Sequence, residues 1–202
     1  LYEVYSQYKR TPVTLDNIPL TVQQATIAIE DKNFYHHQGI DFTGVIRAAF
    51  NAIVKGKRLA GGSTITQQLV KNSLLSDTNR TITRKIKEAI LAIGTELTYS
   101  KSQILELYLN YTPYGGTAYG IETASETYFG KAAKNLTLAE SALLAGLPQS
   151  PTRYSPFGAN PELAIARQHD VLRRMVEDKY ITQEEADQAK AEKLIYAKKN
   201  IS

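Results

Sequence analysis

The amino-acid sequence predicts an all-α fold, and three observations carry this prediction. At several places Ser or Thr is followed three residues later by Gln or Glu, the capping-box pattern of a helix N-terminus. Apolar residues recur at helical spacing, for example at Ile86, Ile90, Ile93 and Leu97. Strands and helices do not alternate along the chain, so no doubly wound sheet is available to hold a nucleotide.

The first half of the chain begins with residues 2–15, which we expect to form an extended arm or a short strand. A mostly apolar segment over 41–54 ends in the basic turn KGKR. Four helices are expected to begin at N-terminal signals: Thr21 with Gln24, Ser63 or Thr64, a start near Thr81 to Thr83, and Ser100 with Gln103.

In the second half, loops rich in Gly, Tyr and Pro over 110–120 and 147–158 lie on either side of a short apolar helix. Thr137 with Glu140 begins that helix. A longer helix is expected from Pro161 toward Tyr180, and Thr182 with Glu185 begins the last one.

The composition is that of a globular domain, with 202 residues of which 43% are hydrophobic. The net charge of +4 favours an anionic partner such as phosphate, an acidic membrane surface or nucleic acid, although solvated surface lysines explain it equally well. The absence of cysteine excludes disulfides and thiol catalysis. No run approaches the roughly 20 apolar residues of a membrane span.

The first cluster of residues that could carry out chemistry is EDKNFYHHQG at 30–39. A metal site is one interpretation, but the cluster lacks the usual two-histidine spacing. A charged turn, in which Asp31 caps the next segment, is the second. The third makes Glu30, at the end of an apolar helix, a partly desolvated carboxylate suited to general-base chemistry.

The second cluster is RKIKE at 84–88, where Arg84 and Lys85 share a helix face with Glu88. By itself this is an ordinary surface ion pair. Nearby polar groups make an anion site more plausible, because they could hold phosphate and sugar oxygens together: Ser63, Thr64, Gln67, Gln68 and Lys71.

These residues belong to five ordered motifs: EDKNFYHHQG at 30–39, GGSTITQQLVK at 61–71, RKIKE at 84–88, KSQILELYLN at 101–110 and RQHDVL at 167–172. With them, the chain over about 15 to 190 resembles the family 51 glycosyltransferases, the peptidoglycan transglycosylase domains of class A penicillin-binding proteins and of monofunctional enzymes. The fifth motif usually carries a second arginine, and Gln168 replaces it here.

The resemblance implies a lysozyme-like, two-lobed, all-α domain with a short N-terminal extended arm. Residues 1–15 would be the arm or linker from a membrane anchor, and 16–190 the transglycosylase domain. A small membrane-proximal lobe is expected at about 42–62. Residues 191–202 would begin a linker toward a transpeptidase domain.

The implied activity is the polymerisation of lipid II into β-1,4-linked glycan, with inversion and release of undecaprenyl pyrophosphate. Glu30 would be the general base, and Glu88 would assist departure of the pyrophosphate, directly or by ordering a divalent ion such as Mg²⁺ or Mn²⁺. Asp31, Phe34 and His37 would support Glu30. The implied substrate-binding residues are Ser63, Thr64, Gln67, Gln68, Lys71, Arg84, Lys85, Asn110 and Arg167.

The implied partners are lipid II, the growing glycan strand, the inhibitor moenomycin and other proteins of cell-wall synthesis, with no role for nucleic acid. Segment 42–59, apolar and basic, would contact the membrane surface. The implied location is the extracytoplasmic face of the bacterial plasma membrane. Two other classes remain open: a lysozyme-like lytic enzyme, which has no use for the cations, and a non-catalytic module that binds lipid-linked glycans.

Overall fold

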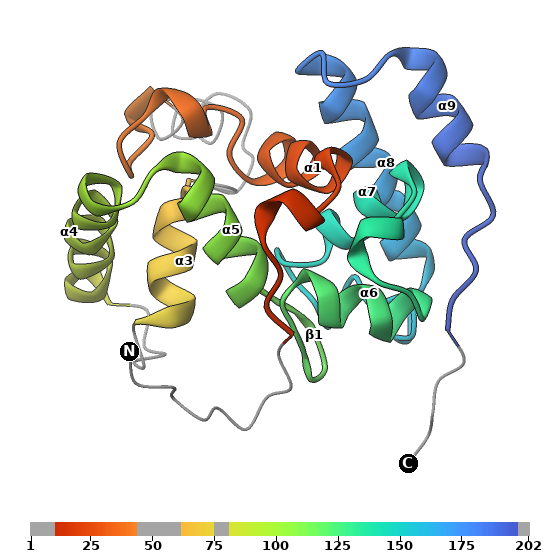
Figure 1. Ribbon diagram of the computed structural model, residues 1–202, viewed down its shortest axis with the longest axis horizontal. Helices are drawn as coiled ribbons and strands as arrows, with labels where there is room; N and C mark the ends of the chain where they lie inside the picture. The colour runs from red at the N-terminus through yellow and green to blue at the C-terminus, as the bar shows by residue number, and fades with distance from the viewer. Residues whose placement is uncertain (1–10, 44–61, 75–80, 198–202) are drawn as a thin grey trace. The chain divides into compact units, whose positions relative to one another are not determined.

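The computed structural model describes residues 11–43, 62–74 and 81–197 (Figure 1). The chain divides into two compact units: a larger unit, Leu1–Ile29 with Leu109–Ser202, and a smaller unit, Glu30–Tyr108. In the described ranges the regular structure is helical apart from one two-stranded sheet, which confirms the all-α prediction.

The larger unit is built around a buried central helix, α7 (Leu138–Gly146). This helix contacts α6 (Ile121–Phe129), α8 (Glu162–Glu177) and α9 (Gln183–Ala191) (Figure 1). Its alanines are small enough to let neighbouring helices approach closely, and residues 139–146 are all buried. The core around it also includes residues of α1 (Leu20–Glu30), and its buried members are Ala25, Ala28, Ile29, Ala139, Ala142, Ala145, Val171, Leu172, Met175, Ala186 and Ala189.

Most of the predicted helix starts are confirmed. Reciprocal capping boxes begin α7 at Thr137 and α9 at Thr182. The prediction for α1 is wrong, because this helix begins at Leu20 and Thr21 lies inside it. The Thr21 hydroxyl instead makes a hydrogen bond of 3.0 Å with the hydroxyl of Ser141 on α7.

The expected loop over 110–120 contains a small antiparallel hairpin, β1 (Pro113–Gly115) with β2 (Ala118–Tyr119). Gly115 and Gly116 both have positive φ, which lets the chain reverse between the strands. The Tyr128 hydroxyl donates to the carbonyl oxygen of Tyr114 at 2.9 Å and ties β1 to α6. Strands of three and two residues are too short to leave an alternating sequence pattern.

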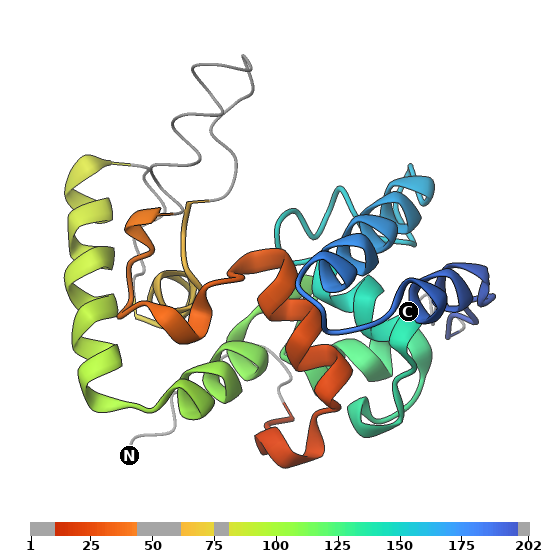
Figure 2. The ribbon, with the colours of Figure 1, turned by 90° about the horizontal axis from the view of Figure 1, so that it is seen from above.

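The smaller unit contains η2 (Phe34–His36), α3 (Ile65–Ser73), α4 (Ile82–Thr98) and the part of α5 (Lys101–Tyr111) that ends at Tyr108. Helices α3 and α4 lie side by side (Figures 1 and 2). Gly39 has φ of +88° and lies so close to α4 that a Cβ atom there would be 2.9 Å from the backbone carbon of Ala92. Only glycine permits this contact between the first motif and α4.

Helix α4 leaves its apolar face exposed. Its fully buried residues are only Glu88 and Ala92. The predicted helix is confirmed, but its periodic apolar residues face solvent rather than a core, with exposed fractions from 42% to 82%. These five residues form what we call the α4 stripe: Ile82, Ile86, Ile90, Ile93 and Leu97.

Several expectations fall partly or wholly outside the described residues. These are most of the arm over 1–15, nearly all of the small lobe over 42–62, and the end of the segment 191–202. Of the arm, residues 11–14 have no regular structure, and Val13 is bound to the side chain of Asn110. Within the described ranges, every helix is too short or too polar to cross a bilayer.

Candidate active site

Glu30 is the last residue of α1, and a side chain of α3 holds its carboxylate. The Gln68 amide donates from Nε2 to Oε2 of Glu30 at 2.7 Å. The other end of that amide, Oε1, accepts from the Tyr108 hydroxyl at 3.4 Å. Because Tyr108 occupies the oxygen, the nitrogen of Gln68 is directed at the carboxylate.

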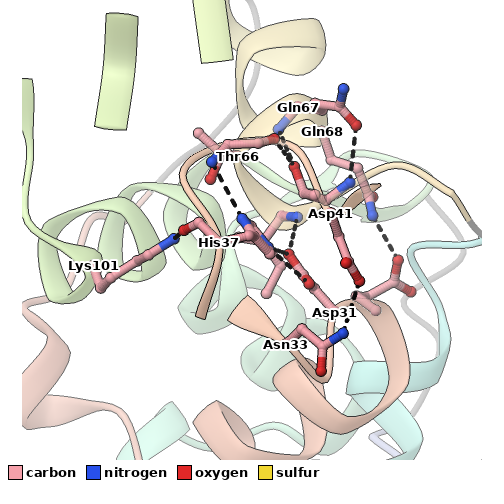
Figure 3. A network of polar contacts seen from close by, with 12 residues as sticks. Asp31, Asn33, His37, Asp41, Thr66, Gln67, Gln68 and Lys101 are labelled. Atoms are coloured by element: carbon pink, nitrogen blue, oxygen red, sulfur yellow. Dashed lines mark hydrogen bonds and ion pairs between the residues drawn. The ribbon is translucent and has the colours of Figure 1, made fainter. Parts of the chain in front are cut away.

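Asp31 links the first motif to the start of α3 (Figure 3). Its carboxylate accepts from the Ile65 backbone N–H at 2.9 Å and contacts Nε2 of His37 at 2.9 Å. The Gly39 N–H points at Nδ1 of His37, 3.2 Å away. A backbone N–H can only donate, so Nδ1 carries no proton and Nε2 donates to Asp31. An anionic carboxylate at a helix N-terminus is favourable both for the free N–H groups and for the helix dipole.

The first turn of α3 is fastened to the same loop. Thr64 is its N-cap and forms a capping box with Gln67. The Thr64 hydroxyl also donates to the carbonyl oxygen of Gly39 at 2.6 Å. Thr64 and Gln67 are both buried, and these contacts hold the helix start against the first motif. Their assignment as substrate ligands stays a prediction.

Glu88 is buried between two cations. Its Oε1 lies 3.2 Å from Nε of Arg84, and its Oε2 lies 2.9 Å from Nζ of Lys85. Nζ of Lys85 also donates to the Ser63 hydroxyl at 2.8 Å. The Glu88 side chain is 3% exposed and that of Lys85 is 50% exposed. The carboxylate therefore anchors the two cations from inside, while the Lys85 ammonium remains accessible to an anion.

Lys71, near the end of α3, lies within electrostatic range of both predicted catalytic carboxylates. Partial removal of water from its ammonium lowers the pKa of Lys71, and the positive charges of Lys85 and Arg84 act in the same direction. Glu88 and Glu30 oppose this change without reversing it. The three cations Lys71, Lys85 and Arg84 outnumber the two carboxylates in range, so an anionic ligand would be favourable here.

The surroundings of Glu88 do not fit a divalent metal ion. Both carboxylate oxygens already contact cations. Among the described residues there is no group of three or more acidic or histidine side chains arranged to hold a metal. Hard divalent cations require several oxygen ligands, and the described residues around Glu88 offer one carboxylate flanked by two positive charges.

Two predicted ligands belong to the larger unit. The Asn110 side chain accepts from the Val13 N–H at 2.9 Å and donates to the Val13 carbonyl oxygen at 2.8 Å. Arg167 forms an ion pair of 3.0 Å with Asp170 and lies over the ring of Tyr154. Gln168 is buried and donates to the carbonyl oxygen of Ala139 at 2.8 Å, which ties α8 to α7. The substitution in the fifth motif therefore occupies a core position.

Three residues next to the predicted site had no assigned role in the sequence: Tyr108, Glu96 and Lys101. Tyr108 orients Gln68, and Lys101 contacts Glu96 and His37. Lys101 and Tyr108 lie within the fourth motif, which was the available signal. Their contacts depend on the packing of α5 against the first motif, and no local pattern encodes that packing.

Comparisons with known proteins identify the family of the chain. A family model described as transglycosylase matches residues 1–176. The chain therefore belongs to the transglycosylase family, which confirms the resemblance and the enzyme class it implies, a peptidoglycan glycosyltransferase.

Among the relatives, penicillin-binding protein 1A of Aquifex aeolicus is 48% identical over 99% of this chain, and penicillin-binding protein 1A of Escherichia coli is 47% identical over 93%. The chain spans 27% and 22% of those two proteins. A crystal structure of penicillin-binding protein 1A from Haemophilus influenzae matches 94% of this chain and 18% of its own, with a TM-score of 0.58 and 26% identity.

Lys71→Met should raise the free energy of unfolding at neutral pH. Because the folded state lowers the pKa of Lys71, its ammonium costs stability below that lowered pKa, and the cost disappears as pH rises toward the ordinary value of 10.5. The gain should be less than about 1 kcal/mol, since the side chain is partly exposed. Urea unfolding at neutral and alkaline pH measures it, and the advantage should shrink at alkaline pH.

Lys87→Met, at an exposed lysine of α4, is the control and should leave stability within about 0.5 kcal/mol. A Lys71→Met variant that is less stable than wild type at neutral pH would mean that attraction to Glu88 and Glu30 outweighs desolvation.

Proposed function

We propose that this chain polymerises lipid II into β-1,4-linked glycan strands, with Glu30 as the general base. The observation that carries the proposal is the placement of two carboxylates on one unit, with the Lys71 ammonium in electrostatic range of both. A lytic enzyme acting on a neutral glycan has no use for cations beside its second carboxylate. A lipid pyrophosphate leaving group is anionic, and cations at this place would stabilise it.

In the proposed step, Glu30 takes the proton from the 4-hydroxyl of the acceptor sugar as that oxygen attacks the anomeric carbon of the donor. The bond from this carbon to the lipid pyrophosphate oxygen breaks, and the configuration inverts. The hydrogen bond from Gln68 directs the Glu30 carboxylate and favours its charged form, which is the form a base needs.

Negative charge develops on the departing pyrophosphate, and fixed cations stabilise it most where it develops. Lys71, Arg84 and Lys85 supply these cations. Glu88 holds Arg84 and Lys85 in position through its two ion pairs, and this is the role we assign to it in departure of the leaving group. No step is assigned to a metal ion, because both oxygens of the Glu88 carboxylate already contact cations.

The supporting residues act through position. Asp31, His37 and Phe34 hold the loop that follows Glu30, and Ser63 and Gln68 present polar groups near the two carboxylates. We propose that the same anion site accepts the phosphate of moenomycin. Asn110 and Arg167 remain proposed substrate ligands of the larger unit.

Glu30→Gln should lower the rate of polymer formation from labelled lipid II by at least about 100-fold, the usual contribution of a general base. The glutamine can still accept from Gln68, so the fold should be retained. Glu88→Gln should lower the rate by about 10-fold or more, because Arg84 and Lys85 lose their anchor.

Circular dichroism confirms folding of both variants. Polymer formation by Glu30→Gln at the wild-type rate would contradict the assignment of the base. Release of sugars from preformed glycan, without polymer from lipid II, would favour the lytic alternative. A wild-type chain that binds lipid II but forms no polymer from it would favour the non-catalytic binding module.

Lipid II resides in a membrane, and we propose that the α4 stripe contacts an anionic phospholipid surface on the extracytoplasmic face of the plasma membrane. Five exposed apolar side chains follow one face of α4, and the exposed Lys87 lies on the same helix. An apolar face beside basic residues is the pattern of helices that lie in the membrane interface. Segment 42–59 would add to this contact.

The double variant Ile86→Ser with Ile90→Ser should weaken binding to anionic phosphatidylglycerol vesicles about 10-fold or more, because both exposed isoleucines lose apolar area for burial in lipid. Vesicle co-sedimentation measures this. The control, Ile165→Ser with Ile195→Ser in the larger unit, should bind like wild type. Vesicle binding by the α4 variant at the wild-type level would contradict the assignment. A variant that loses self-association but still binds vesicles would also contradict it.

A further inference from the structure

A partly buried ion pair joins the end of α4 to the start of α5, apart from the residues assigned above. Nζ of Lys101 lies 2.8 Å from Oε1 of Glu96, and their side chains are 21% and 6% exposed. Burying two charges is costly unless their remaining hydrogen-bonding groups also find partners. The other contacts of this pair therefore indicate what it does.

Lys101 contacts the first motif. Its ammonium donates to the carbonyl oxygen of His37 at 2.7 Å (Figure 3). The same ammonium lies 4.5 Å from the centre of the Phe34 ring. The His37 ring in turn donates to Asp31, the residue that follows Glu30. Lys101 thus holds the loop over 31–39 by its backbone and by its buried aromatic ring.

Glu96 contacts α3. Its Oε1 accepts from the Thr66 hydroxyl at 2.5 Å. Thr66 lies between Ile65, whose N–H binds Asp31, and Gln67, which closes the capping box. Gln68, the next residue, donates to Glu30. One ion pair is therefore bonded on one side to the loop after Glu30 and on the other to the turn that carries Gln68.

We propose that the ion pair of Glu96 with Lys101 positions Glu30, by fixing the loop over 31–39 against the first turn of α3 so that the Gln68 amide meets the Glu30 carboxylate. This inference rests on the proposed function, because the position of Glu30 matters for activity only if Glu30 is the base. Glu96 and Lys101 act on Glu30 through the loop and through Gln68, so both are positioning residues.

The decisive variant is Glu96→Gln with Lys101→Met. Removing only the lysine would leave Glu96 buried without its counter-charge and would destabilise the fold. Removing both charges avoids this, while the bond to the His37 carbonyl is still lost. Thermal unfolding should show a melting temperature within a few degrees of wild type.

With lipid II as substrate, this double variant should lose about 10-fold to 100-fold in kcat while KM changes less than about 2-fold, as expected when a catalytic group is misplaced and substrate binding is kept. The acid limb of its pH–rate profile should move to higher pH, since a carboxylate that loses a hydrogen-bond donor is protonated more readily. The single variant Lys101→Arg, which keeps a cation beside Glu96, should retain most of the wild-type kcat.

The matched control is the ion pair of Lys131 with Glu140 in the larger unit, where the two groups lie 2.6 Å apart and are 30% and 8% exposed. Lys131→Met should lower the melting temperature but leave kcat and the pH–rate profile of the folded enzyme unchanged. A similar fall in kcat for this control would show a general effect of stability, and would overturn the positioning role.

Wild-type kcat and an unshifted pH profile in the folded double variant would also overturn the inference, while leaving the proposed function intact. If the wild-type chain makes no polymer, the proposed function fails, and the side-chain amide resonance of Gln68 in an NMR spectrum tests the positioning separately. That resonance should move in the double variant and stay in place in Lys131→Met. A resonance unmoved in the double variant overturns the inference.

Discussion

The geometry of the smaller unit depends on the carboxylate of Asp31, which accepts from the His37 ring and from the first N–H of α3 (Figure 3). These two bonds join the end of α1 to the start of α3. The residue before Asp31 is Glu30, and the fourth residue of α3 is Gln68. The buried Asp31 carboxylate therefore brings the proposed base, Glu30, next to its hydrogen-bond donor, Gln68. The other contacts of the loop, from Lys101 and to Gly39, reinforce this junction.

A second constraint is electrostatic. Arg84, Lys85 and Lys71 gather around Glu88, and burial lowers the pKa of the Lys71 ammonium, with the charges of Lys85 and Arg84 acting in the same direction. Clustered cations lower the stability of the folded state, so stability alone does not account for this arrangement. The arrangement becomes favourable when an anion such as a pyrophosphate binds, so the same charges that cost stability in the free chain contribute to recognition.

Local signals in the sequence predicted most of the fold. The helix starts at Thr64, Thr137 and Thr182 are confirmed, because each N-cap and its hydrogen-bond partner lie within one helical turn. The predicted start of α1 is wrong because the helix begins one residue earlier, at Leu20, and the Thr21 hydroxyl bonds to Ser141, a residue 120 positions away. The exposed face of α4 was equally hidden, because periodicity predicts a helix with an apolar side but not whether another element covers that side.

For the site, the motifs identified the residue types but not their partners. The spacing of Arg84, Lys85 and Glu88 predicted their ion pairs, since three and four residues bring side chains together on a helix. The bond from Gln68 to Glu30 and the pair of Glu96 with Lys101 depend on how separate helices pack. The burial of Gln168 could not be predicted either, because the motif gives its position in the sequence but not the residues that surround it.

The most direct test of this account is the protonation of the His37 ring, measured by ¹⁵N NMR at neutral pH. The bond from the Gly39 N–H requires Nδ1 to accept, so the ring proton should lie on Nε2, protected from rapid exchange by Asp31. Asp31→Asn should speed that exchange. A proton on Nδ1, or an Nε2 proton that exchanges freely in the wild-type chain, would contradict the claim that Asp31 and His37 hold the loop beside Glu30.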